Sequence, residues 1–369
     1  MSMRLFEFTP KSPITVNHGH SERSRRCAVA CEESISRLKG EIPHSVSGHG
    51  FLVAALLEMT VKTFLCGLIA CSVFAETGRS GASFLKIAPT AGAEAMGGAY
   101  TAVTSGIGAL YYNPAGMVYN RQTQAGFTHT SWIQGMTYDF AGGIIPVAWG
   151  NMGISVISMR SGDIDGRDAA GMKTADFESS DTAFTLSAAR ELNSGNMLGA
   201  NVKFIRQTLA DESAEGFAID LGAMRELTDR VSLGLSVRNL GPDMKFIEEK
   251  YPLPLTFTLG GMFKFARLFG LTADMAYEPV DEKKTFRMGM QLAPARFMVL
   301  RAGYMMKAVT AVYGNTESDN FEDAESAPWR DEGIGGGVGF NFGSYALDYS
   351  IKPYADLGTS QRVSFRIEF

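Results

Sequence analysis

From Thr123 to the end of the chain, apolar and polar residues alternate in fourteen short runs. In residues 231–238, for example, every odd position is valine or leucine and every even position is serine, glycine or arginine. Successive side chains of a β-strand point to opposite faces, so each run predicts a strand with one apolar and one polar face. Fourteen such runs in succession predict an all-β architecture.

The connections between the predicted strands alternate between short and long. Brief turns lie at residues 149–151, 227–230, 294–296 and 343–344, and long polar stretches cover residues 161–181, 239–254 and 307–332. A transmembrane β-barrel sorts its connections in this way, with the tight turns and both chain ends on the periplasmic side, whereas a soluble β-sandwich has no reason to do so. We therefore expect residues 123–369 to form a 14-stranded antiparallel transmembrane β-barrel.

The last ten residues repeat this pattern and end on an aromatic residue. Val363, Phe365, Ile367 and Phe369 share one face, and polar residues occupy the other. A terminal strand of this kind is typical of bacterial outer-membrane barrels, so Phe369 is the predicted insertion signature. The hydrophobic content of 45% would also fit a soluble protein, because alternation hides the apolar face of a barrel in the overall composition.

Residues 59–75 have the features of a secretory signal peptide. Met59 provides a start, Lys62 is the single basic residue, and a short apolar run leads to small residues at Val73 and Ala75. The run is too short for a transmembrane helix, which needs about 20 apolar residues. Residues 1–58 would then be a mis-assigned or disordered extension. Two alternatives remain open, an anchor helix over residues 51–75 and lipidation at Cys71.

The part of the chain after residue 75 gives no sign of catalysis or of nucleic-acid binding. It carries 26 Lys and Arg against 33 Asp and Glu, a balance that argues against a nucleic acid as partner. His129 is the only histidine beyond residue 49, and no serine lies in a Gly-x-Ser-x-Gly elbow. Metal ligands do not cluster there. We expect a non-enzymatic protein without a cofactor or a bound metal.

A segment rich in small residues precedes the first predicted strand. Residues 81–117 do not alternate, and a barrel of fourteen strands encloses more space than its own side chains fill. Gly97 and Gly98 would permit close backbone contact or positive φ, and Asn113 with Pro114 would set a tight turn. We therefore predict that residues 76–122 form a hatch in the lumen. A periplasmic leader is the alternative.

Three motifs resemble the PorV/PorQ family, whose members are relatives of the FadL fatty-acid channels. The first is the combination of GASFLKI, AMGGAYTAV and ALYYNPAGM, the second is VSLGLSVRNLGP, and the third is the terminal hairpin LDYSIKPYADLGTSQRVSF. Gly92 and Gln361 depart from the family pattern. The motif positions in the hatch are Gly81, Phe84, Leu85, Met96, Gly97, Gly98, Ala99, Asn113, Pro114, Ala115 and Gly116.

The resemblance implies a barrel in the bacterial outer membrane, in contact with its lipid and obstructed by the amino-terminal hatch. PorV-like members take part in type IX secretion, where they receive exported cargo proteins and pass them to other secretion components. FadL-like members instead let hydrophobic compounds such as long-chain fatty acids pass. We expect protein export first and hydrophobic-compound transport as the alternative.

Each function has a candidate site in the sequence. For transport, Gly142, Gly143 and Pro146 interrupt the second predicted strand, where a kink or bulge would open a lateral gate. A bulge without function is the alternative there. For cargo binding, an acidic loop with apolar anchors is the candidate partner site, and a merely solvated or calcium-holding loop is the alternative. Its residues are Glu317, Asp319, Phe321, Glu322, Asp323, Glu325 and Trp329.

Overall fold

The computed structural model describes residues 79–103, 106–167, 171–193, 195–265, 268–309, 329–354 and 358–369. All of them belong to a unit that spans Ala75–Phe369. The predicted extension 1–58 and the predicted signal peptide 59–75 lie outside the described residues. None of the described helices is long and apolar enough to cross a bilayer.

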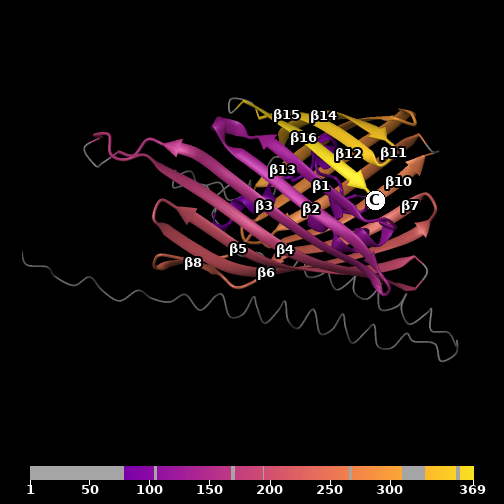
Figure 1. The fold of residues 1–369 in the computed structure, drawn as a ribbon, viewed down its shortest axis with the longest axis horizontal. Coiled ribbons are helices and arrows are strands. Elements are labelled where there is room, and N and C mark those ends of the chain that lie inside the picture. Colours follow the sequence, from indigo (N-terminus) through magenta and orange to yellow (C-terminus); the bar gives the residue numbers. More distant parts are fainter. Residues whose placement is uncertain are drawn as a thin grey trace, which may run out of the picture. The chain divides into compact units, whose positions relative to one another are not determined.

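The wall is a closed antiparallel sheet, which confirms the predicted 14-stranded barrel (Figure 1). The barrel closes where β1 pairs with β16, and a separate hairpin of β8 (Met244–Phe246) and β9 (Glu249–Tyr251) lies outside the ladder. The wall strands are β1 (Gln124–Ser131), β2 (Thr137–Val147), β3 (Gly150–Ile164), β4 (Phe177–Asn193), β5 (Asn196–Leu209), β6 (Glu212–Thr228), β7 (Val231–Leu240), β10 (Thr256–Phe265), β11 (Phe269–Glu278), β12 (Lys283–Ala295), β13 (Met298–Val309), β14 (Trp329–Phe342), β15 (Tyr345–Pro353) and β16 (Thr359–Glu368).

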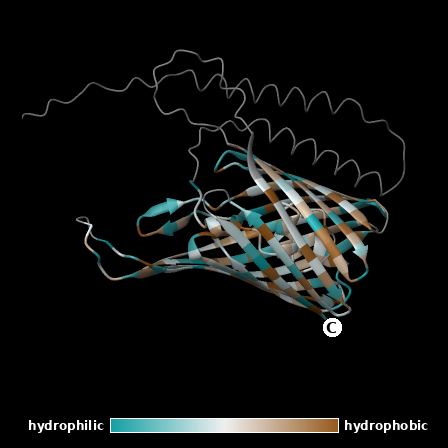
Figure 2. Ribbon diagram, turned by 90° about the horizontal axis from the view of Figure 1, so that it is seen from above, coloured by the Kyte–Doolittle hydropathy of each residue, from teal (hydrophilic) through white to brown (hydrophobic). Residues whose placement is uncertain are grey.

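The alternation in the sequence becomes an outer and an inner face. Hydrophilic and hydrophobic segments alternate along the strands (Figure 2). On the outer face, six residues that pair directly from one strand to the next form a row, and all six are apolar. This row is Phe127, Ala141, Val156, Phe184, Phe204 and Phe217. An apolar exterior around a more polar interior is the arrangement that lipid requires of a barrel.

The two ends of the barrel carry different connections. At one end, the turn end, every connection is short, such as residues 229–230 and 343–344. The opposite end, the loop end, carries the long connections 165–176, 241–255 and 310–328. The predicted strict alternation is nevertheless wrong, because β5 and β6 are joined at the loop end by residues 210–211 alone. Their ladder continues to the pair Leu209 and Glu212, and Ala210 closes the turn with a φ of 51°.

The described residues before β1, 79–103 and 106–123, lie inside the barrel as a hatch. It contains the 3₁₀-helices η1 (Ser83–Lys86) and η2 (Pro114–Tyr119) and the short α-helices α3 (Ala91–Ala95) and α4 (Ala109–Tyr112). The described hatch starts at the loop end, where the Gly81 N–H donates to the Pro252 carbonyl at 2.9 Å. It ends at the turn end, where the Phe369 N–H donates to the Thr123 carbonyl at 2.9 Å. The hatch therefore runs the height of the lumen.

Glycines of the wall let the hatch approach closely. A Cβ at Gly303 of β13 would lie 2.0 Å from the Gly97 nitrogen, and one at Gly222 of β6 would lie 2.1 Å from Asn113 Oδ1. Neither distance is compatible with any side chain larger than hydrogen. Because these two contacts lie on different parts of the wall, the hatch is fitted to the barrel on more than one side.

Candidate functional site

Inward side chains of five neighbouring strands form an apolar row near the loop end. Phe140 of β2 pairs with Ile157, Ile157 with Ala183, Ala183 with Ile205, and Ile205 with Gly216 of β6. The side chains of Phe140, Ile157, Ala183 and Ile205 are buried inside the barrel. We call these five residues the apolar row. It gives one side of the lumen a surface that favours contact with apolar groups over water.

Next to the apolar row, on its turn-end side, the inner face of the wall becomes polar. The Lys203 ammonium lies 2.7 Å from Asp220 Oδ2 and donates to Asn239 Oδ1 at 2.8 Å. Asp220 in turn accepts the Asn239 N–H at 2.8 Å. A buried ion pair is tolerated only with such additional hydrogen bonds. The apolar surface is therefore confined to the part of the wall nearest the loops.

Residues 79–88 of the hatch, which we call the strap, cover the apolar row. Phe84 and Leu85 are buried in the same hydrophobic cluster as the row. Two tyrosine hydroxyls fix the strap. Tyr111 of α4 in the hatch donates to the Leu85 carbonyl at 2.7 Å, and Tyr138 of β2 in the wall donates to the Ile87 carbonyl at 3.1 Å. The strap therefore occupies the space beside the apolar row.

Asp281, in the connection between β11 and β12, tethers the strap at the loop end. It accepts the Ser80 N–H at 3.2 Å and the Ser80 hydroxyl at 3.0 Å, and it forms an ion pair with Lys86. Lys86 also lies 3.5 Å from Glu278. Burial raises the pKa of Asp281, but Lys86 and Ser80 outweigh it and hold that pKa below its ordinary value. The tether is therefore ionised at neutral pH.

The hairpin of β8 and β9 and the segment after it pack on the strap side of the cluster. Met244 of β8 and Leu253 are buried with Phe84 and Leu85. The Ala82 N–H of the strap donates to Gln207 of β5 at 3.0 Å. The apolar row is thus enclosed by the wall, the strap and this hairpin segment.

Another part of the wall, β15 and β16, anchors the hatch by charge. Glu94 of α3 lies 3.0 Å from Arg362 of β16 and 3.8 Å from Lys352 of β15, and it accepts the Tyr354 hydroxyl at 3.2 Å. Burial raises the pKa of Glu94, but the two cations and the hydrogen bonds outweigh it, so the pKa lies below its ordinary value. On β11, Asp274 Oδ2 accepts the Tyr100 and Thr101 N–H groups at 3.0 and 2.9 Å.

The Asn-Pro-Ala-Gly element of the hatch packs against the wall on the side of the apolar row. Asn113 accepts the Ala115 N–H at 3.2 Å, which opens η2, and its amide donates to the carbonyls of Thr101 and Ala223 at 2.9 and 3.1 Å. Pro114 is the first residue of η2, where its missing N–H costs nothing. The element holds the hatch in place, and it follows the strap in the sequence.

The other hatch positions fall into two groups. Gly81, Phe84 and Leu85 belong to the strap. Met96, Gly97, Gly98, Ala99, Ala115 and Gly116 are buried deeper in the hatch. Gly97 and Gly98 have positive φ, 65° and 77°, so the backbone there takes a form that glycine adopts without strain.

The ladders of β2 show no bulge at the predicted lateral gate. Gly142 and Gly143 lie in ladders that run without a register shift to both β1 and β3. Gly142 instead makes room for the hatch, because a Cβ there would lie 2.7 Å from the Leu110 side chain. Pro146 lies beyond Ile144, where the β1 ladder ends, so its missing N–H breaks no bond on that side.

The predicted partner loop falls largely outside the described residues. This applies to Glu317, Asp319, Phe321, Glu322, Asp323 and Glu325, whereas Trp329 begins β14. Phe369 is exposed at the turn end, next to its contact with Thr123. Among the residues that the structure describes, no group of three or more His, Cys, Asp or Glu could hold a metal ion.

The sequence reasoning missed the apolar row. Each of its residues is an ordinary apolar side chain in an alternating strand, and only the cross-strand register brings the five together. One signal was present in the sequence. In β3 and β5 the inward positions change from polar to apolar along the strand, as from Ser155 to Ile157 and from Lys203 to Ile205.

Comparisons with known proteins identify structures with a similar fold. No family model matches the chain, and no curated protein matches it. The toluene transporter TodX of Pseudomonas putida has 13% sequence identity and a TM-score of 0.53 over 80% of this chain and 98% of that one. The monoaromatic hydrocarbon channel CymD has 13% identity and a TM-score of 0.52 over 76% and 97%. A Pseudomonas aeruginosa FadL homologue has 11% identity and a TM-score of 0.51 over 76% and 98%. This chain thus shares the barrel fold of FadL-type channels.

Proposed function

We propose that the protein is an outer-membrane channel for hydrophobic small molecules, which bind at the apolar row. The observation that carries this proposal is the apolar row itself, covered by Phe84 and Leu85 rather than sealed by the wall. The shared fold supports it, since the similar structures include hydrocarbon channels and a toluene transporter.

Binding at the row requires the strap to move aside. An incoming apolar molecule then replaces the contacts of Phe84 and Leu85 with its own, so little apolar surface is left in water. The hydrogen bonds to the Leu85 and Ile87 carbonyls limit how easily the strap leaves. The strap thus acts as a plug that hydrophobic molecules displace and that water does not.

The rest of the hatch argues against a wide aqueous pore. The hatch touches the wall at Gly303 and Gly222, and Glu94 is held by two buried cations. Polar solutes gain nothing from the apolar row, and the hatch blocks the straight path through the barrel. We therefore propose selectivity for apolar compounds over sugars and ions.

The apolar exterior and the predicted signal peptide support a place in the outer membrane, with the turn end in the periplasm. Protein export has less support than transport. The similar structures are channels for small molecules, and the acidic loop lies outside the described residues. The PorV/PorQ resemblance and its secretion partners stay predictions.

The test is uptake of labelled toluene and of a labelled long-chain fatty acid into cells that lack their own channels of this kind. Ile205→Asn places an amide in the apolar row, and we expect uptake to fall about tenfold. Thr258→Asn is the matched control, because Thr258 is also a buried inward residue but lies on β10, away from the row. Equal uptake by both variants and the unmodified protein would refute the proposal.

A further inference from the structure

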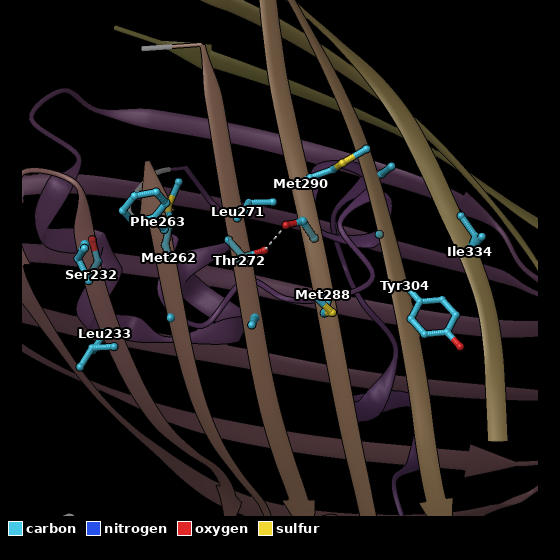
Figure 3. Close-up of a pocket in the computed structure, with 16 residues that line it drawn as sticks. Ser232, Leu233, Met262, Phe263, Leu271, Thr272, Met288, Met290, Tyr304 and Ile334 are labelled. Atoms are coloured by element: carbon cyan, nitrogen blue, oxygen red, sulfur yellow. Dashed lines mark hydrogen bonds between the residues drawn. The ribbon is translucent and has the colours of Figure 1, made fainter. Parts of the chain in front are cut away.

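A second apolar hollow lies on the outer face of the wall. A groove of about 740 Å³ crosses β7, β10, β11, β12, β13 and β14 (Figure 3). In that view the side chains of Leu233, Met288 and Tyr304 are drawn against the strands, and the hatch passes behind them. The groove therefore faces the surroundings of the barrel and not its lumen.

The strand register explains why the surface is hollow here. One outward row joins large and small residues in direct pairs across the six strands. The row is Leu233, Gly261, Ala273, Met288, Tyr304 and Ile334. Gly261 and Ala273 are adjacent and form a low floor, while Leu233 and Met288 are exposed and rise on either side.

A second outward row runs alongside the first and completes the groove. It contains Phe263, Leu271, Met290 and Ala302, with Leu271 paired to Met290 and Met290 to Ala302. Methionine side chains adapt their shape to what they contact. Six strands at about 4.8 Å spacing make the groove about 24 Å long, measured across the strands.

The groove does not open into the barrel. Behind it, a Cβ at Gly289 would lie 2.7 Å from the Met96 side chain, and Gly303 meets the Gly97 backbone. The hatch thus fills the inner side of the same strands. What occupies the groove comes from the membrane and not from the lumen.

Two opposite charges lie at the turn end of the groove. Asp229 and Arg230 form the exposed turn between β6 and β7, directly before Val231, which lines the groove. The Lys264 N–H donates to the Arg230 carbonyl at 2.7 Å, which places the turn beside Phe263. Adjacent acidic and basic side chains complement a head group that carries both a phosphate and an ammonium.

We propose that the groove binds one phosphatidylethanolamine molecule of the membrane leaflet at the turn end. One acyl chain lies over Gly261 and Ala273, the phosphate binds Arg230, and the ammonium faces Asp229. This lipid binding requires insertion in a membrane but does not require transport, so it can be tested independently of the proposed channel function.

The test is native mass spectrometry of the purified full-length barrel in detergent, titrated with phosphatidylethanolamine. Ala273→Phe fills the floor of the groove, and we expect phosphatidylethanolamine to bind about tenfold more weakly. Ala200→Phe is the control, because Ala200 is a small outward residue of β5 on another part of the wall, paired with Ala188. Its binding should match the unmodified protein.

Arg230→Gln separates the head group from the acyl chain and changes only an exposed turn. We expect it to weaken phosphatidylethanolamine binding about tenfold and to leave diacylglycerol binding unchanged, because diacylglycerol lacks the phosphate. The proposal is overturned if Ala273→Phe binds like Ala200→Phe, if lipid A is the preferred ligand, or if the groove instead holds a second copy of the chain that Ala273→Phe releases.

Discussion

The two sides of the lumen hold the hatch in different ways. Along β2 to β6, near the loop end, the strap rests on the apolar row, with Phe84 and Leu85 as its contacts. Along β15 and β16, Glu94 is fixed by Arg362 and Lys352. Apolar contacts are exchangeable, because any apolar molecule can replace them, whereas a buried ion pair has no substitute. Exchange with apolar molecules therefore belongs to the part of the lumen along β2 to β6, and anchoring belongs to the part along β15 and β16.

The anchoring side should give the largest effect. Glu94→Gln leaves Arg362 and Lys352 without their carboxylate, and breaking a buried pair in this way costs about 3–5 kcal/mol. We expect the hatch to loosen and ion conductance in planar bilayers to rise strongly. Glu215→Gln is the control, because Glu215 forms an exposed pair with Arg206 on β5. If both variants conduct alike, Glu94 is not an anchor.

The same anchor predicts the pH dependence of hatch closure. The ionised form of Glu94 is favoured in the closed barrel, so its contribution is complete above its ordinary pKa of 4.5 and is lost as the pH falls through the lowered value. Conductance should stay flat between about pH 7 and pH 5 and rise in stronger acid. Glu94→Gln should lack this acid response. A rise that begins near neutral pH would contradict the assignment.

The exchange side should give a gain instead of a loss. Replacing Phe84 and Leu85 together with alanine removes the side chains that compete for the apolar row, so hydrophobic molecules should bind about tenfold more tightly. Binding of a fluorescent fatty acid to the purified barrel measures this. Phe127→Ala is the control, because Phe127 is exposed on the outer face of β1. Unchanged affinity in the double variant would mean that the strap does not occupy the binding site.

The tether of the strap should give the smallest effect. Asp281→Asn removes the charge that pairs with Lys86 but keeps a side chain that accepts from Ser80. Lys86 is partly exposed, so we expect the loss to be about 1 kcal/mol and uptake of toluene to rise a few-fold. Asp165→Asn is the control, because Asp165 pairs with Lys173 on the exposed surface of the loop end. Slower uptake in Asp281→Asn would reverse the assigned role.

The fold was predictable because alternation is a local property of the sequence. The wall, its strand number and the position of the hatch follow from patterns that need no contact between distant residues. The candidate site was not predictable, because Phe140, Ile157 and Ile205 come together only through the register of the strands. The prediction of a bulge at Gly142 was wrong for a related reason. Glycine in a strand signals either a bend or a close neighbour, and here the neighbour is Leu110.

The path of the hatch has a consequence for biogenesis. Its first described residues contact the connection after β9, while Glu94 needs Arg362 on the last strand. The hatch cannot seat until the carboxy-terminal strands have joined the sheet, although it is made first. Sealing of the lumen by the hatch therefore depends on the last strands having joined the sheet.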